Sequence, residues 1–188
     1  MQNSKRILIN TGAQYIRAIL NIVLSLFATR IVLRVLGVED YGIYALVAGV
    51  VSILSFITNS LIITTQRYLS VVQGEDNIEK SKIIFNNSNI LHIAIGLSLI
   101  IILEALLPLL FNGFLNIPEC RIIAAKVLYH SIAVVLFLTL VTSPYRAVLI
   151  SHENIVFISI IEIIDSCLKL AIAYALYATP YDKLVTYG

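Results

Sequence analysis

Charged residues are scarce in this sequence of 188 residues. Only 13% are Asp, Glu, Lys or Arg, whereas soluble domains carry about 25%. Apolar residues make up 59% of the chain, and the mean hydropathy is +0.93. Such a chain lacks the polar residues that a water-exposed surface needs. The composition therefore excludes an ordinary soluble domain and predicts a membrane protein.

Cysteine is also rare, and the sequence lacks the motifs of common catalytic and metal sites. Cys120 and Cys167 form no C-x-x-C pair, so both are expected to stay unpaired. No cluster of His, Cys, Asp or Glu has metal-ligand spacing, and no glycine-rich phosphate loop, nucleophile elbow or triad-like set is present. No run of basic residues indicates binding to nucleic acid. We therefore expect neither an enzyme nor a metal, a cofactor or a nucleic-acid partner.

Long apolar stretches predict an all-α, polytopic transmembrane helical bundle. Five of them approach the roughly 20 residues that a helix needs to cross a bilayer. They cover approximately residues 11–36, 44–64, 90–110, 122–142 and 155–177. Gly and Pro lie at the joins, as in the expected turn Gly37–Gly42. The first stretch is too long for a signal peptide and is expected to remain as a helix, and Asp182–Gly188 is expected to open a sixth span.

The placement of charge favours a cytoplasmic N-terminus. Lys5 and Arg6 flank the first span on one side, and Glu39 and Asp40 lie beyond its other end. Basic residues near the ends of a span are enriched on the cytoplasmic side of membrane proteins. Basic residues in the other loops are nearly balanced, so this prediction depends on the first span.

One arginine lies inside the first apolar stretch. Arg17 forms a row with four polar residues at steps of three or four, namely Asn10, Gln14, Asn21 and Ser25. At 100° per residue the row spans about 80° of one helix face. A charge at the bilayer centre costs about 2.5–3.5 kcal/mol on insertion scales, so the row is expected to face a bundle interior or an aqueous cavity. Two roles fit Arg17: binding of a phosphate group and pairing with an intramembrane carboxylate.

The fifth span carries the densest charge of all the predicted spans. Glu162, Asp165 and Lys169 follow at steps of three and four and share one helix face. Lys169 is expected to pair with Asp165 one turn away, which leaves Glu162 without a partner in its own helix. Three roles fit Glu162: binding a proton, binding a cation, and pairing with Arg17. The cluster therefore predicts ion coupling, state-dependent pairing or a structural network.

Two further arginines lie near the end of the first span. Arg30 and Arg34 are one turn apart and are expected to point roughly opposite to the Arg17 row. Long basic side chains at the end of a span extend toward the membrane interface. The pair therefore fits either interface anchors or a cationic vestibule.

The remaining polar residues of the spans favour structural roles. Asn59 belongs to a face of the second span with Ser52, Ser55 and Gln66. Such a face either joins helices or lines a cavity together with the Arg17 row. Structural hydrogen bonding is expected of Glu104, His92 and His130, and Pro108 is expected to kink or end the third span.

The segment around the first join resembles a known family. Residues 30–47, Arg-Ile-Val-Leu-Arg-Val-Leu-Gly-Val-Glu-Asp-Tyr-Gly-Ile-Tyr-Ala-Leu-Val, resemble the end of the first helix and the start of the second in bacterial polysaccharide and lipopolysaccharide flippases. These are the O-antigen, Wzx-type members of the multidrug/oligosaccharidyl-lipid/polysaccharide exporter superfamily. Supporting similarities extend over nearly the whole chain, at residues 10–11, 65–70, 115–119, 143–147, 151–153 and 182–184.

The resemblance implies two helical lobes around a central cavity, with residues 1–188 as an incomplete N-terminal lobe. It implies movement of undecaprenyl-pyrophosphate-linked oligosaccharide from the cytoplasmic to the periplasmic leaflet of the bacterial inner membrane, by alternating access. This step serves the synthesis of surface polysaccharide or lipopolysaccharide. The implied partners are the lipid-linked glycan, membrane lipid and other polysaccharide-assembly proteins.

The resemblance also suggests roles for the polar faces. Arg17 matches a first-helix position that would contact the pyrophosphate, supported by Gln14, Asn21 and Asn59. The charges Glu162, Asp165 and Lys169 would supply ion coupling or state-dependent pairing. One alternative is a cation-coupled multidrug exporter of the same superfamily, in which the two carboxylates matter most. Another is a non-transporting membrane fragment or scaffold.

Overall fold

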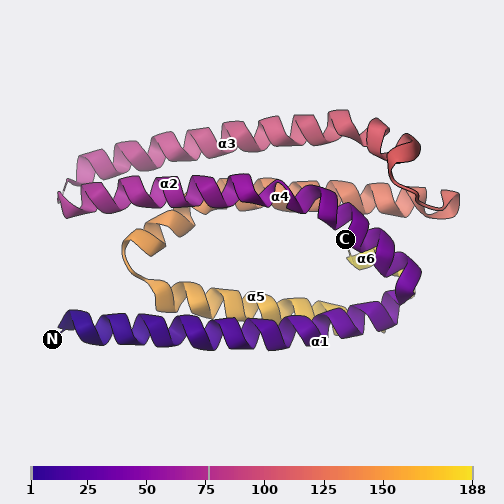
Figure 1. The fold of residues 1–188 in the computed structure, drawn as a ribbon, viewed down its shortest axis with the longest axis horizontal. Coiled ribbons are helices and arrows are strands. Elements are labelled where there is room, and N and C mark those ends of the chain that lie inside the picture. The colour runs from indigo at the N-terminus through magenta and orange to yellow at the C-terminus, as the bar shows by residue number, and fades with distance from the viewer. Residues whose placement is uncertain (1, 76, 188) are drawn as a thin grey trace. The chain divides into compact units, whose positions relative to one another are not determined.

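The computed structural model describes residues 2–75 and 77–187, with side chains from residue 8 onward. All regular structure in these ranges is helical, which confirms the all-α prediction (Figure 1). The chain divides into two units: the first combines Met1–Tyr41 with His152–Tyr187, and the second is Gly42–Ser151. Each unit is described by itself. The side chains of Lys5 and Arg6, on which the predicted orientation depends, lie outside the described part.

Six α-helices make up most of the described chain: α1 (Gln2–Ser52), α2 (Ser55–Gly74), α3 (Ile78–Leu109), α4 (Ile122–Ser151), α5 (Ile155–Ala175) and α6 (Lys183–Tyr187). A wide turn η1 (Leu110–Phe114) and a tight turn η2 (Glu119–Arg121) connect α3 to α4. Three stretches are long and apolar enough to cross a membrane, namely Leu8–Ser52, Ile78–Phe114 and Glu119–Ser151. The number of five spans stays a prediction, because α2 is rich in Ser and Thr and α5 carries three charged residues.

A glycine breaks α1 close to the first expected join. Gly37 has φ 80° and ψ 172°, whereas the residues on both sides keep helical dihedrals. This backbone region is open to glycine and strained for other residues. The predicted turn over Gly37–Gly42 is therefore wrong in extent: the break is confined to Gly37, and the helix resumes at Val38.

The second expected span is not one regular helix. α1 ends at Ser52 and α2 begins at Ser55. Between them the amide of Leu54 donates to the carbonyl of Val51, and that of Ile57 to the carbonyl of Leu54, both at 3.0 Å. Bonds over three residues tighten the chain into a turn. The predicted second span is therefore interrupted by a turn between Ser52 and Ser55.

The third helix begins earlier and ends where expected. Its N-cap is Asn77, whose side chain accepts a hydrogen bond from the Lys80 amide at 2.9 Å. Such a cap satisfies an amide that has no partner within the helix, so α3 starts at Ile78 and not near residue 90. Pro108 lies one residue before the end of α3, in line with the predicted kink or end.

Helices α2, α3 and α4 pack against one another in the second unit. Helices α3 and α4 are antiparallel, since His92 contacts Leu140 and Leu103 contacts Tyr129 farther along. Leu103, Leu128, Tyr129 and Leu140 are almost completely buried between these helices. Gly96 allows the close approach, because a Cβ at this position would lie 2.9 Å from the ring of Phe137. Small residues serve this purpose where membrane helices meet.

In the first unit, α5 lies beside the N-terminal part of α1, and the two run in the same direction (Figure 1). Parallel packing is what the five-span interpretation requires, since three crossings would separate the first span from the fifth. The short helix α6 begins after Asp182, whose carboxylate accepts from the Leu184 amide at 3.0 Å. A helix therefore begins where the sixth span was expected, and its being the start of a membrane span stays a prediction.

Candidate functional site

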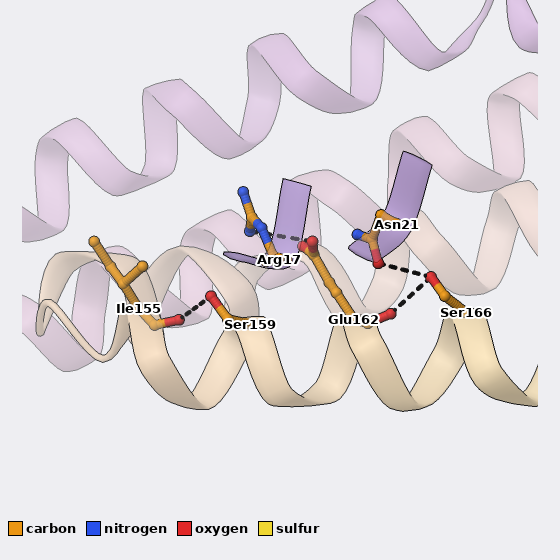
Figure 2. Close-up of polar contacts among 6 residues, drawn as sticks. All are labelled: Arg17, Asn21, Ile155, Ser159, Glu162 and Ser166. Carbon is orange, nitrogen blue, oxygen red and sulfur yellow. Dashed lines mark hydrogen bonds and ion pairs between the residues drawn. The ribbon is translucent and has the colours of Figure 1, made fainter. Parts of the chain in front are cut away.

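The Arg17 row of α1 faces the charged face of α5. Arg17 Nη1 lies 3.1 Å from Glu162 Oε2, and each side chain is about a quarter exposed (25% and 24%). Figure 2 shows the two side chains pointing toward one another from neighbouring helices. Of the three roles that fit Glu162, the structure contains the pairing with Arg17. An arginine paired in this way carries its charge into an apolar helix at reduced cost.

Hydrogen bonds continue this contact in both directions along the helices. One turn beyond Arg17, the Ser166 hydroxyl donates to Asn21 Oδ1 at 2.9 Å, with the carbonyl of Glu162 as an alternative acceptor at 3.0 Å (Figure 2). Toward the N-terminus, Asn10 Nδ2 donates to the carbonyl of Glu153 at 3.2 Å. We call this set the polar seam; it consists of Asn10, Arg17, Asn21, Glu153, Glu162 and Ser166.

The polar seam keeps a constant register. The bonded residues are 143 apart in sequence at Asn10 and 145 apart at Asn21, and Arg17 and Glu162 are also 145 apart. Near-constant separation is the mark of parallel helices in contact. Asn10 and Arg17 are seven residues apart, the spacing of contacts along such a pair. The seam is therefore a continuous interface and not a single accidental contact.

The polar seam can act chemically as a site for exchange of partners. A guanidinium has a fork of donors that suits a carboxylate and a phosphate equally well. In the observed state Glu162 occupies one edge of that fork. A phosphate that approached Arg17 would compete with this carboxylate for the guanidinium.

The other predicted members of the two faces lie outside the polar seam. Gln14 is exposed, and the Ser25 hydroxyl donates to the carbonyl of Ile22 in its own helix at 2.9 Å. Lys169 Nζ lies 2.7 Å from Asp165 Oδ2, which confirms the predicted pair within one helix. Both of these side chains are more than half exposed. Screening by solvent makes such a pair weak.

Arg30 and Arg34 border α5, contrary to the expectation that they point away from the Arg17 row. They line a cavity of about 290 Å³ with Phe27 and Ile31 of α1, Tyr174 of α5 and Tyr177 in the turn that follows α5. The prediction counted 100° per residue, whereas packed helices keep contact about every 3.5 residues. On that count Ile31, two heptads after Arg17, reaches the side of α5, and Arg30 and Arg34 flank it.

Asn59, predicted to bind substrate, lies in the second unit. It lines a separate cavity of about 290 Å³, together with Ser55 and Thr58 of α2 and Thr139 and Arg146 of α4. The hydroxyl of Thr58 is buried and has no hydrogen-bond partner. Ser52 also lines this cavity. Part of this polar face therefore lines a cavity, whereas a cavity shared with the Arg17 row stays a prediction.

A buried histidine joins the three helices of the second unit. His92 is completely buried, with Nε2 3.2 Å from Thr65 Oγ1 and Nδ1 beside the Leu140 carbonyl and the Ser143 hydroxyl. A proton on Nδ1 satisfies this arrangement, since Nε2 can then accept from Thr65. His130 Nδ1 lies 2.9 Å from Glu104 Oε1, at an exposed position. Both histidines therefore have the structural hydrogen bonds that were predicted.

Several members of these sites were not predicted. The sequence analysis missed Thr65 and Ser143 as partners of His92, and Tyr174 and Tyr177 as lining of the arginine cavity. Heptad spacing along α1 is the signal that could have indicated the face toward α5. In the ranges that the structure describes, no three His, Cys, Asp or Glu side chains gather into a group that could hold a metal.

Comparison with known proteins supports the membrane assignment. The chain is 24% identical over 181 residues to a protein of Bacillus subtilis (strain 168) named "Uncharacterized membrane protein EpsK". The aligned region covers 94% of this chain and 35% of that protein, so the chain spans about a third of the relative. No family model and no solved structure matches the chain.

The chain is a helical membrane protein. Its three long apolar helical stretches and its relative both support this assignment. Large apolar side chains also remain outside the core, as at Ile19 and Leu26, which are 62% and 66% exposed. Contiguous apolar surface of this kind is rare on soluble monomers and suits contact with lipid.

Proposed function

We propose that this chain is the N-terminal part of a flippase for lipid-linked oligosaccharides. The substrate would be a polyprenyl-pyrophosphate-linked glycan that crosses from the cytoplasmic to the periplasmic leaflet of the bacterial inner membrane. The N-terminus would be cytoplasmic. The residue pattern at positions 30–47 supports this assignment, as does the membrane-protein relative.

The observation that carries the proposal is the ion pair of Arg17 and Glu162 inside membrane-length helices. A transported pyrophosphate needs a cation that holds it and then releases it. Arg17 supplies the cation, and Glu162 supplies a competing anion. Substrate phosphate would displace Glu162 from Arg17, and return of Glu162 would expel the phosphate. This exchange gives each transport state its own partner for Arg17, which is what a population shift between two states requires.

The proposal can be tested with Arg17→Gln in the complete protein. Export of surface polysaccharide should be abolished, while the amount of protein in the membrane stays normal. Lys82→Gln, which removes one exposed positive charge from α3, serves as the control and should export normally. Undiminished surface polysaccharide in Arg17→Gln would remove Arg17 from the mechanism.

A second substitution separates glycan transport from multidrug export. Glu162→Gln leaves Arg17 without its competing carboxylate, so the lipid-linked glycan should bind but not be released. Export should therefore fall while binding of the glycan persists. If drug resistance depended on Glu162 and Asp165 while surface glycan was unchanged by all these variants, a cation-coupled drug exporter would replace the flippase proposal.

A further inference from the structure

The cavity at the end of the α1–α5 pair has the composition of a site for an anion. Arg30 and Arg34 of α1 line it, with Tyr174 and Tyr177 opposite and Phe27 and Ile31 completing the wall. None of these six residues is acidic. Its volume of about 290 Å³ lies just below the roughly 300–1,000 Å³ typical of small-molecule pockets. A cavity of this size suits a headgroup and not a glycan chain.

The two arginines differ from Arg17 in having no carboxylate partner. In the described ranges, no ion pair or hydrogen bond to the side chain of Arg30 or Arg34 occurs. They are one helical turn apart, so their like charges repel. Both are exposed. An anion bound between them would remove this repulsion.

The chemistry of the lining suits a phosphate group at a membrane surface. Guanidinium groups bind phosphate oxygens through paired, charge-assisted hydrogen bonds. Tyrosine hydroxyls add neutral donors, and tyrosine is enriched where membranes meet water. Phe27 and Ile31 offer an apolar wall beside these donors. We propose that this cavity binds the phosphate of an anionic membrane lipid, with Arg30 and Arg34 as its ligands.

This lipid site is separate from the polar seam. Arg30 follows Arg17 by thirteen residues, or about 20 Å along a helix at 1.5 Å per residue. A phosphate held at one position does not reach the other. The proposal therefore does not depend on the flippase assignment, and a normal or abolished export in Arg17→Gln leaves it unchanged.

The test uses the complete protein, purified in detergent, with lipid binding followed by native mass spectrometry. Phosphatidylglycerol should bind more tightly than phosphatidylcholine with the same acyl chains. The double variant Arg30→Gln/Arg34→Gln should weaken phosphatidylglycerol binding about tenfold or more, since it removes two charge-assisted contacts. The control Arg67→Gln/Lys82→Gln removes two exposed charges elsewhere and should retain binding. Equal losses in both double variants, or no loss in the first, would overturn the proposal.

Two further arms keep the test decisive. Tyr174→Phe/Tyr177→Phe keeps both rings and removes two hydroxyl donors. Phosphatidylglycerol should therefore bind roughly threefold to tenfold more weakly. An unchanged melting temperature shows that this variant is folded. If the arginine variant fails to fold, the tyrosine variant tests the site in its place. Unchanged binding of phosphatidylglycerol to the tyrosine variant would contradict the proposed site. Inorganic phosphate at the concentration of the lipid should not displace phosphatidylglycerol. Displacement would instead show that the cavity binds soluble phosphate and would contradict the proposal of a lipid site.

Discussion

The guanidinium of Arg17 lies 3.1 Å from the carboxylate of Glu162, and this contact joins two helices whose paired residues are 145 positions apart in sequence. A single charge of either kind would be expensive inside a bilayer. Together the two side chains form a neutral pair that the surrounding polar seam holds in register. The stability of the first unit should therefore depend on both residues as a pair.

A double-mutant cycle tests this coupling. Glu162→Gln should lower the melting temperature of the complete protein in detergent, because it leaves Arg17 as an unpaired charge. Arg17→Gln/Glu162→Gln should recover part of that loss, with a coupling free energy of about 0.5–3 kcal/mol. The comparison cycle uses Asp165→Asn and Lys169→Gln, which are more than half exposed and should couple by less than about 1 kcal/mol. Equal coupling free energies in both cycles would show that the Arg17–Glu162 pair stabilises the protein no more than an exposed pair does.

Local patterns were sufficient for the helical class, for the polar face around Arg17, and for the Asp165–Lys169 pair. All three depend on residues within a few turns of one another. The partner of Arg17 depends on the register between α1 and α5, which local patterns do not give. For this reason the sequence left three roles open for Glu162. The direction of Arg30 and Arg34 was wrong because packing changes the effective period along a helix. The break between α1 and α2 could not be predicted, because residues 52–55 contain neither Gly nor Pro.

A second prediction concerns the buried histidine of the second unit. His92→Leu should destabilise the protein by about 1–3 kcal/mol, because the Thr65 hydroxyl then loses its partner inside the helix bundle. His130→Leu is the matched control, since its bond to Glu104 lies at an exposed position. Thermal unfolding in detergent should place the His92 variant clearly below the control. Equal melting temperatures would mean that the His92 network does not hold α2, α3 and α4 together.

A third prediction concerns the contact of α3 with α4. Gly96→Ala should destabilise by about 1–3 kcal/mol, because the new methyl group meets the Phe137 ring in a packed interface. Gly49→Ala makes the same change where nothing lies within 4 Å of the added Cβ, so it should be neutral or stabilising through helix propensity. Phe137→Leu combined with Gly96→Ala should restore stability. A melting temperature of Gly96→Ala at or above that of Gly49→Ala would contradict the close approach.

The break in α1 provides the last prediction. Gly37 has space for a Cβ but a φ of +80°, whereas Gly42 has neither a positive φ nor a neighbour within 4 Å. Gly37→Ala should therefore cost about 1–3 kcal/mol through backbone strain alone, and Gly42→Ala should be tolerated. The variant can relieve this strain if residue 37 becomes helical, so that α1 continues without a break. Unfolding in detergent measures the cost. Pulsed electron paramagnetic resonance between spin labels at residues 33 and 41 would detect this change. The distance between the labels would shift toward the value expected for a continuous helix. A variant that is both fully stable and unchanged in that distance would show that the conformation at residue 37 does not require glycine.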